Sequence, residues 1–176
     1  MSSGDQIKGQ DLFLRQQLNK NINGPVIICD GIQTPENFGS ILRVADATGS
    51  KDIWLLDSDL DLKSKKLSKL ARSVDRHLNI EHLTLSCFEQ KREEIKTLYA
   101  LEITTQSKNI FETDISRCDG IVIGHESLGI RPKLLNYCDR AIHLPMYGTN
   151  GSMNVSHALS VFLYEWRRQQ SIQPLY

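Results

Sequence analysis

Three polar segments of this 176-residue sequence carry residue types that could bind or orient a ligand. Residues 30–43, 124–129 and 144–154 combine glycine, asparagine and serine with charged side chains. Each segment follows a short apolar run of the kind that forms a buried strand. Ligands bind beyond the carboxyl ends of the strands in open parallel sheets, so we expect one pocket to collect all three segments.

Each segment also has an ordinary structural explanation. Asn37 and Arg43 could be polar positions on a surface helix, and Glu126 could be a solvated carboxylate in a loop. Gly151 and Ser152 could belong to a loop that only leads into a helix. The case for a site therefore depends on the position that the three segments share, directly after strands.

Several familiar site motifs are absent from the sequence. No GxGxxG follows the first apolar run, and neither GxxxxGK[ST] nor GxSxG occurs, which argues against nucleotide-phosphate binding and against a serine hydrolase. The four cysteines form no CxxC pair and have no histidine at metal-binding spacing, so we expect reduced thiols and no metal. They are Cys29, Cys87, Cys118 and Cys138.

Short apolar runs alternate with helical patterns along the whole chain. This alternation predicts an α/β fold with a parallel sheet and helices on both faces. We expect one domain over residues 1–176, with a short N-terminal extension (1–23) before the main fold (24–169). The expected strands are residues 26–30, 53–57, 80–83, 100–103, 120–124 and 141–144.

Capping residues mark the expected helices. Thr34 should cap a helix that stops at Gly49, and Ser86 with Glu89 forms a capping box for a helix ending near Leu98. Residues 132–138 should form a short helix. A final helix should begin at Ser152 as its N-cap, bury a stripe from Val155 to Trp166, and carry Arg167 and Arg168 at its negative end.

The charge balance limits the choice of partners. Lys and Arg total 21, as do Asp and Glu, and this neutrality argues against a general electrostatic nucleic-acid binder without excluding a local basic face. Residues 59–78 are such a basic segment, although a solvated surface would have the same composition. No apolar run reaches 18 residues and the N-terminal residues lack a secretory apolar core, so we expect a cytoplasmic protein with no membrane contact.

Three motifs at these strand ends resemble one family. Asn37-x-Gly39-x-x-x-Arg43-x-Ala45, Ile123-Gly124-x-Glu126-x-x-Gly129, and Leu144-Pro145-Met146 with Ser152-Met153-Asn154-Val155-Ser156 resemble the motifs of the SpoU (TrmH-like) RNA 2′-O-methyltransferases of the SPOUT superfamily. The resemblance covers residues 24–169, with the motifs in the family's order. Met153 departs from the usual leucine, which is a nearly isosteric change.

The resemblance implies a fold, a cofactor, a partner and a set of site residues. It implies a deep C-terminal trefoil knot that holds S-adenosylmethionine, and an antiparallel homodimer whose active sites lie at the subunit interface. The implied catalytic residues are Arg43, Asn37, Glu126, Ser152 and Asn154. The implied cofactor-binding residues are Thr104, Gly124, Glu126, Gly129, Ile142, Leu144, Met146, Gly151, Ser152 and Met153. We expect RNA contacts from Lys69, Arg72, Arg76 and Arg131, and no metal.

The roles and the RNA substrate leave alternatives open. Glu126 could favour the cofactor's positive charge or could organise its loop. Residues 71–73 and 164–168 resemble TrmH more than the minimal wobble-base enzymes, and this resemblance favours tRNA with a D-loop guanosine target, while ribosomal RNA stays open. A catalytically idle RNA-binding or assembly factor of the same fold, or an unrelated enzyme acting on a small molecule, are the other hypotheses.

Overall fold

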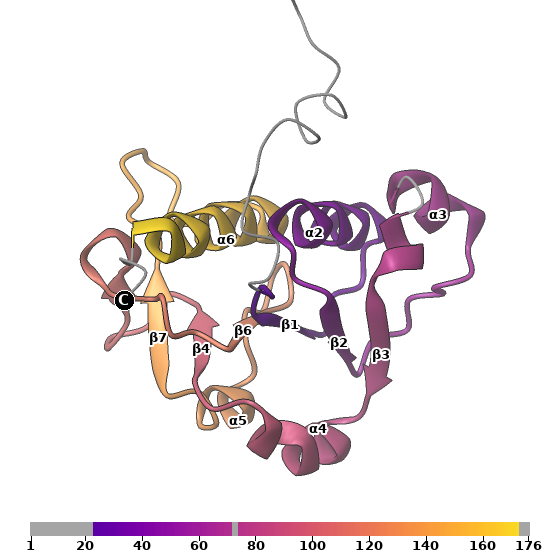
Figure 1. Ribbon diagram of the computed structural model, residues 1–176, viewed down its shortest axis with the longest axis horizontal. Helices are drawn as coiled ribbons and strands as arrows, with labels where there is room; N and C mark the ends of the chain where they lie inside the picture. The colour runs from indigo at the N-terminus through magenta and orange to yellow at the C-terminus, as the bar shows by residue number, and fades with distance from the viewer. Residues whose placement is uncertain (1–22, 72–73, 173–176) are drawn as a thin grey trace, which may run out of the picture.

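The computed structural model describes residues 23–71 and 74–172, whose strands form one seven-stranded sheet (Figure 1). The strand order is β3-β2-β1-β6-β4-β7-β5, and every pairing is parallel. The strands are β1 (Val26–Asp30), β2 (Asp52–Leu56), β3 (Asn79–Leu83), β4 (Leu98–Leu101), β5 (Lys108–Asn109), β6 (Gly120–Ile123) and β7 (Arg140–His143). The predicted parallel α/β class is confirmed, and only β5, which is too short to give a pattern, was not expected.

The middle of the sheet explains the apolar runs. β1, β6 and β4 are neighbours, and Ile27, Ile28 and Cys29 of β1 have no exposed surface. Such strands are covered on both faces, so their side chains are continuously apolar instead of alternating. The edge strand β3 is mostly exposed and accordingly carries polar residues.

Helices cover both faces of the sheet, as predicted (Figure 1). One face carries α6, α2 and α3 side by side, and the other carries α4 and α5. The helices are α2 (Pro35–Thr48), α3 (Lys65–Ala71), α4 (Leu85–Lys91), α5 (Pro132–Leu135) and α6 (Val155–Ile172). Three single turns of 3₁₀ helix are η1 (Val74–His77), η2 (Arg92–Glu94) and η3 (Ile110–Glu112).

The motif glycine Gly39 serves the packing of two helices. A Cβ atom at this position of α2 would lie 2.7 Å from the Cβ atom of Leu70 in α3. Real Cβ atoms do not approach that closely, so Gly39 is what allows α3 to pack against α2. It therefore positions the basic segment instead of contacting a ligand.

Two predicted helix starts were wrong. Thr84 caps α4 by accepting a hydrogen bond from the Cys87 amide, and this helix ends at Lys91 instead of near Leu98. α6 begins after Asn154, whose Oδ1 accepts from the Ser156 amide at 2.9 Å, so Ser152 is not its cap. In both places a neighbouring residue with an equally good capping side chain is used.

The predicted C-terminal end of α6 was also wrong. The helix runs on to Ile172, so Arg167 and Arg168 do not lie in its last turn. Arg167 Nε instead donates to the Thr48 carbonyl at the end of α2, and Arg168 pairs with Glu165. Arg167 therefore holds α6 against the end of α2, and Arg168 forms an ion pair on the surface of α6.

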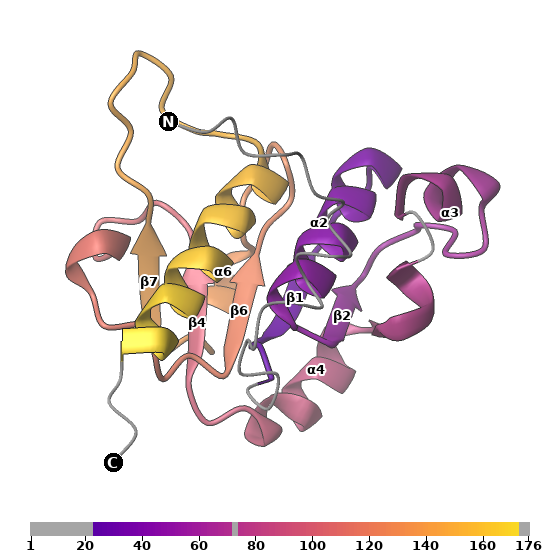
Figure 2. The same ribbon diagram turned by 45° about the horizontal axis from the view of Figure 1, so that its top comes forward.

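All strands point the same way, so the loops after them gather at one edge of the sheet (Figure 2). From β1 the chain builds outward through β2 and β3, and it then returns to the other side of β1 with β6 and β4. This reversal between β1 and β6 is where open sheets leave a crevice for ligands. The trefoil knot that the resemblance implies stays a prediction.

Within the described residues, no helix combines the length and apolar character needed to cross a membrane.

Candidate active site

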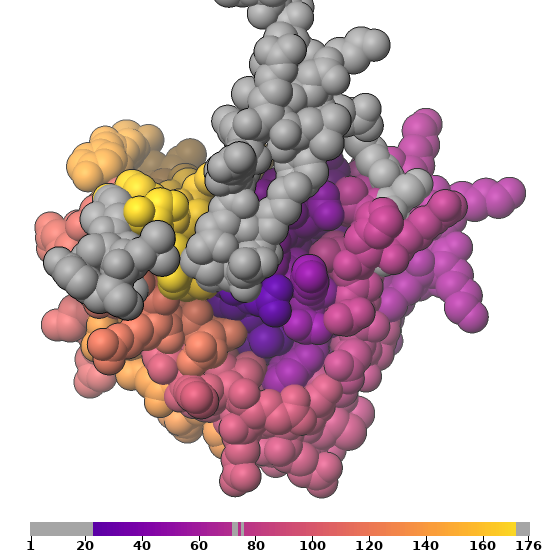
Figure 3. Space-filling view, in the orientation of Figure 1, coloured from indigo at the N-terminus to yellow at the C-terminus, as the bar shows by residue number. Residues whose placement is uncertain are grey.

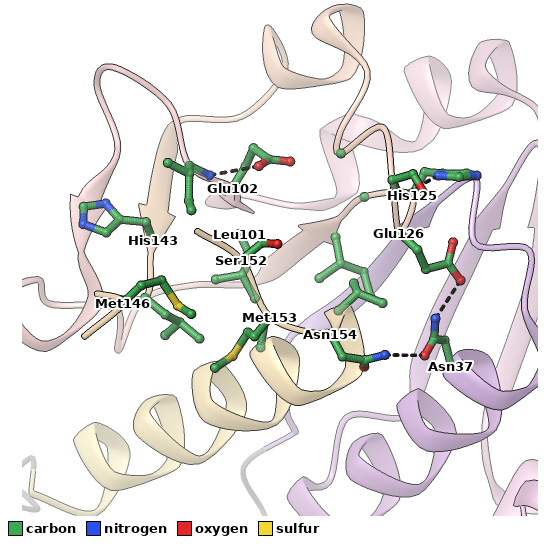
Figure 4. A pocket seen from close by; sticks show the side chains of 18 residues that line it. Asn37, Leu101, Glu102, His125, Glu126, His143, Met146, Ser152, Met153 and Asn154 are labelled. Atoms are coloured by element: carbon green, nitrogen blue, oxygen red, sulfur yellow. Dashed lines mark hydrogen bonds between the residues drawn. The ribbon is translucent and has the colours of Figure 1, made fainter. Parts of the chain in front are cut away.

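A cavity of about 500 Å³ lies beyond the carboxyl ends of β4, β6 and β7 (Figure 4). The starts of α2 and α6 border it, contributing Asn37 and Val155. Its volume falls within the range of small-molecule sites. The three predicted segments meet here, together with a fourth, the loop that follows β4.

Most of the predicted site residues line this cavity. They come from motifs spread over residues 37–154 of the sequence, and the sheet brings them together. The predicted residues at the cavity are Asn37, Gly124, Glu126, Gly129, Leu144, Met146, Ser152, Met153 and Asn154.

Four predicted residues lie outside the cavity lining. Arg43 is exposed on α2, because six helical positions turn it away from the face of Asn37. Thr104 is held in its own turn by Ser107, whose hydroxyl donates to the Thr104 carbonyl. Ile142 is buried in the core and Gly151 is exposed beyond the cavity.

A chain of hydrogen bonds joins the three motifs (Figure 4). Asn37 Nδ2 donates to Glu126 Oε1 at 2.8 Å, and Asn154 Nδ2 donates to Asn37 Oδ1 at 2.8 Å. Asn154 Oδ1 accepts in turn from the Ser156 amide and hydroxyl. The two side-chain amides therefore have fixed orientations. The NH₂ group of Asn154 points toward Asn37, and the NH₂ group of Asn37 points toward the Glu126 carboxylate.

The Glu126 carboxylate is held ionised by these contacts. Partial burial opposes its ionisation, but hydrogen bonds from Asn37 and Thr34 outweigh burial and lower its pKa. The Thr34 hydroxyl donates to Glu126 Oε1 at 2.8 Å. Glu126 thus connects its loop to the start of α2. This is the loop-organising role, one of the two roles that the sequence left open; the other is attraction of the cofactor's positive charge.

The lowered pKa gives Glu126 a pH-dependent contribution to stability. Stability from a depressed carboxyl pKa is present above the unfolded value of about 4.3 and is lost as pH falls through the folded value. We expect Glu126→Gln to lower the free energy of unfolding by up to about 1 kcal/mol at pH 7, and by less toward pH 3. Urea unfolding at a series of pH values measures this, with Glu112→Gln in η3 as the control. An equal difference at every pH would contradict it.

The loop after β6 is held in a tight conformation. His125 and Gly129 exchange two backbone hydrogen bonds, and His125 Nδ1 accepts from the amides of Ser127 and Leu128. Gly129 has a φ of 69°, which favours glycine. The His125 ring therefore organises the loop by accepting these two hydrogen bonds.

Arg131 is occupied by carboxylates at the end of this loop. Its amide and Nε donate to the two oxygens of buried Asp30 at 2.8 and 2.6 Å, and Nη1 donates to Asp57 at 2.6 Å. The arrangement joins the ends of β1 and β2 to the loop after β6. The geometry thus gives Arg131 a structural role, in addition to the RNA contact expected from its charge.

Half of the lining residues were not among the predicted site residues, and the most informative of these lie after β4 and at the end of β7. Glu102 and Ile103 follow β4, and His143 at the end of β7 contacts the Ser107 hydroxyl through Nδ1 at 3.0 Å. The position of Glu102 directly after a strand was the available signal. It was missed because the strand was expected to continue to Ile103, whereas β4 ends at Leu101.

The basic segment forms part of the surface beyond α2. Lys69 and Arg76 are exposed, on α3 and η1, and long side chains of the α3 region project from the surface (Figure 3). Lys66 pairs with Glu36 at 2.6 Å. The predicted RNA-binding residue Arg72 lies outside the described residues. Among the described residues, no group of three or more His, Cys, Asp or Glu could hold a metal ion.

Comparison with known proteins gives a family and several relatives. The model of the SpoU rRNA Methylase family matches residues 24–164. The tRNA (guanosine(18)-2′-O)-methyltransferase of Aquifex aeolicus is 28% identical over 167 residues, covering 93% of this chain and 78% of that protein. A Staphylococcus aureus protein whose name places it in the TrmH family of tRNA/rRNA methyltransferases is 32% identical over 165 residues.

This chain spans 65% of the length of the Staphylococcus aureus protein, which in turn covers 91% of this chain. Among solved structures, the AdoMet-bound rRNA methyltransferase of Sinorhizobium meliloti has a TM-score of 0.76 at 21% identity, covering 88% of this chain and 60% of that one. At this identity the likeness shows the fold.

Proposed function

The chain belongs to the SpoU rRNA methylase family, and from this premise we propose that it is an S-adenosylmethionine-dependent RNA 2′-O-ribose methyltransferase that acts on tRNA. The observation that carries the proposal is the cavity in which the three family motifs meet. Asn37, Glu126 and Asn154 are joined there by hydrogen bonds. A catalytically idle RNA-binding protein of the same fold would not need these three side chains to meet in a cavity.

The cavity lining fits S-adenosylmethionine. Leu144, Met146 and Met153 offer an apolar surface for the adenine base, and Ser152 offers a polar group. A Cβ atom at Gly124 would lie 2.2 Å from the Gly129 carbonyl carbon, so the loop after β6 can close only with glycine there. When bound, the cofactor supplies an electrophilic methyl group, which passes from sulfur to the ribose 2′ oxygen as that oxygen loses its proton.

The residues of this chain would position the RNA and stabilise charge. The Asn37 and Asn154 amides, fixed by their partners, orient the ribose and its neighbours at the cavity mouth. The Arg43 guanidinium stabilises the negative charge that develops on the 2′ oxygen, while it fixes the adjacent phosphate. A phosphate oxygen or a water molecule takes the proton.

A second copy of the chain would complete the site. The described cavity lining includes no Lys or Arg, and Arg43 points away from its own cavity. We therefore propose that Arg43 serves the neighbouring subunit's cavity, in the homodimer that the resemblance implies. The exposed apolar residues Val161 and Tyr164 on α6 would suit such an interface.

The proposed RNA class follows from the relative with a named target. The Aquifex aeolicus relative is named as a tRNA (guanosine(18)-2′-O)-methyltransferase, and it is 28% identical over 93% of this chain. This supports a tRNA D-loop guanosine as the substrate, with ribosomal RNA as the alternative that the family description also suggests.

Labelled S-adenosylmethionine incubated with separate tRNA and ribosomal RNA fractions tests the proposal. We expect label in the tRNA fraction. Label in ribosomal RNA alone would keep the enzyme class and overturn the substrate. Binding without transfer would favour an idle RNA-binding factor, and binding of neither cofactor nor RNA would favour an unrelated small-molecule enzyme.

The basic face gives a prediction about RNA affinity. Lys69 and Arg76 are exposed, and removing one phosphate-binding cation reduces the slope of log K against log salt by roughly one unit. We expect the double variant Lys69→Gln/Arg76→Gln to bind RNA more weakly, with a slope lower by about two units, and to keep its cofactor affinity. Filter binding at several salt concentrations measures this, with Lys51→Gln as an exposed control before β2. An unchanged slope would leave Lys69 and Arg76 as solvated surface residues.

A further inference from the structure

Glu102 is a carboxylate of the cavity that no family motif includes. It follows β4 directly and lines the cavity between the sides occupied by His143 and Glu126 (Figure 4). Its Oε1 accepts from the Ile103 amide and its Oε2 accepts from the Ile130 amide, both at 3.0 Å. Because two backbone groups hold it, this carboxylate has a fixed position.

The loop after β6 is shaped around Glu102. A Cβ atom at Gly129 would lie 2.6 Å from Glu102 Oε2, so the glycine of the second motif leaves room for this oxygen. The amide of the next residue, Ile130, then donates to the same oxygen. The carboxylate therefore lies against the loop that encloses the cavity.

The charged groups of the cavity lining have one sign. Glu102 and Glu126 are its carboxylates, and among the described lining residues there is no lysine or arginine. Hydrogen bonds from Thr34 and Asn37 engage Glu126 on the side of α2. Glu102 lies on the side of β4 and β7. Among the described residues its carboxylate accepts from two backbone amides, so its remaining lone pairs can face a ligand.

We propose that Glu102 makes the cavity select the cationic sulfonium cofactor over its neutral thioether product, a role that rests on the proposed function. S-adenosylmethionine and S-adenosylhomocysteine have nearly the same shape but differ by one positive charge. A fixed carboxylate in a partly closed cavity attracts that charge. Once the methyl group has left, the attraction is gone and the product leaves more readily.

A purely structural role for Glu102 makes a different prediction. If it only joins the loops after β4 and β6, its replacement should weaken both ligands equally. Electrostatic selection requires the ratio of the two dissociation constants to change. Asp139 provides a matched control, because its carboxylate accepts from the Leu98 amide at the opposite end of β4 and pairs with Arg92.

Calorimetric titration of the folded protein with each ligand tests the proposal, at about pH 8 where imidazoles are neutral. We expect Glu102→Gln to reduce the preference for S-adenosylmethionine over S-adenosylhomocysteine by about three- to tenfold. Asp139→Asn should leave the preference unchanged. Equal weakening of both ligands by Glu102→Gln would overturn the selection role, whereas a folded wild-type protein that binds neither ligand would overturn the proposed function itself.

A measurement on the wild-type protein does not depend on the variant folding. Raising the salt concentration from about 0.05 to 0.5 M should weaken S-adenosylmethionine more than S-adenosylhomocysteine, because only the former is held by an added charge. The same salt dependence for both ligands would overturn the proposal.

Discussion

We expect Arg43→Ala to lower kcat/KM for RNA methylation by about a hundred- to a thousandfold and to leave the Kd for S-adenosylmethionine unchanged. The reason is electrostatic. The described cavity lining has two carboxylates and no lysine or arginine, so the charge developing on the 2′ oxygen needs a cation from elsewhere. Arg43→Lys keeps the charge and loses the planar fork, so it should retain activity well above that of the alanine variant. Equal loss in single-turnover assays would contradict charge stabilisation.

Mixed dimers test where Arg43 acts. Arg43→Ala and Glu126→Ala subunits, each inactive alone, should recover about a quarter of wild-type activity after reassortment, because half the dimers are mixed and each has one intact composite site. Recovery requires Arg43 to act across the interface. If Arg43 acted in its own subunit, every mixed dimer would stay inactive.

Asn37→Asp should disrupt the site more than Asn37→Ala does. The aspartate could still accept from Asn154, but it would set a carboxylate oxygen against Glu126 Oε1, where Asn37 Nδ2 now donates at 2.8 Å. Two carboxylates at that separation raise the pKa of one of them. We expect the variant to be about 1–3 kcal/mol less stable than wild type at pH 8 and to be inactive.

The pH dependence of this variant identifies the cause. A carboxyl with a raised pKa destabilises the fold at high pH, and the penalty disappears as pH falls below its unfolded value. Urea unfolding should therefore show Asn37→Asp approaching Asn37→Ala in stability near pH 4. A constant gap between the two variants from pH 8 to pH 4 would show that repulsion with Glu126 is not responsible.

The sequence predicted the middle of the sheet well because its central strands are covered on both faces. The runs around Ile28 and Val122 are apolar at every position, and these residues have no exposed surface. Helix starts were less predictable where two capping residues lie close together. Thr84 and Ser86 could each cap α4, and the sequence pattern does not distinguish them, whereas the structure uses Thr84.

The site was predictable to the extent that strand ends determine it. Glu126 and Asn154 follow strands and meet at the cavity as expected. Glu102 was missed because the sequence predicted a strand that ends at Ile103. The strand β4 ends at Leu101, so Glu102 lies in the loop after it. Arg43 shows the opposite limit, since its helical position places it on the exposed face of α2, outside the cavity that it was predicted to serve.

The position of the transferred methyl group on the RNA tests the proposed methylation of a ribose 2′ oxygen. RNA methylated by the protein with S-adenosylmethionine can be digested to nucleosides and analysed by mass spectrometry. We expect a nucleoside with the added methyl on its ribose, formed by wild type and strongly reduced with Arg43→Ala. A methyl group on the base, or no methylated nucleoside from folded, cofactor-bound protein with tRNA or ribosomal RNA, would contradict it.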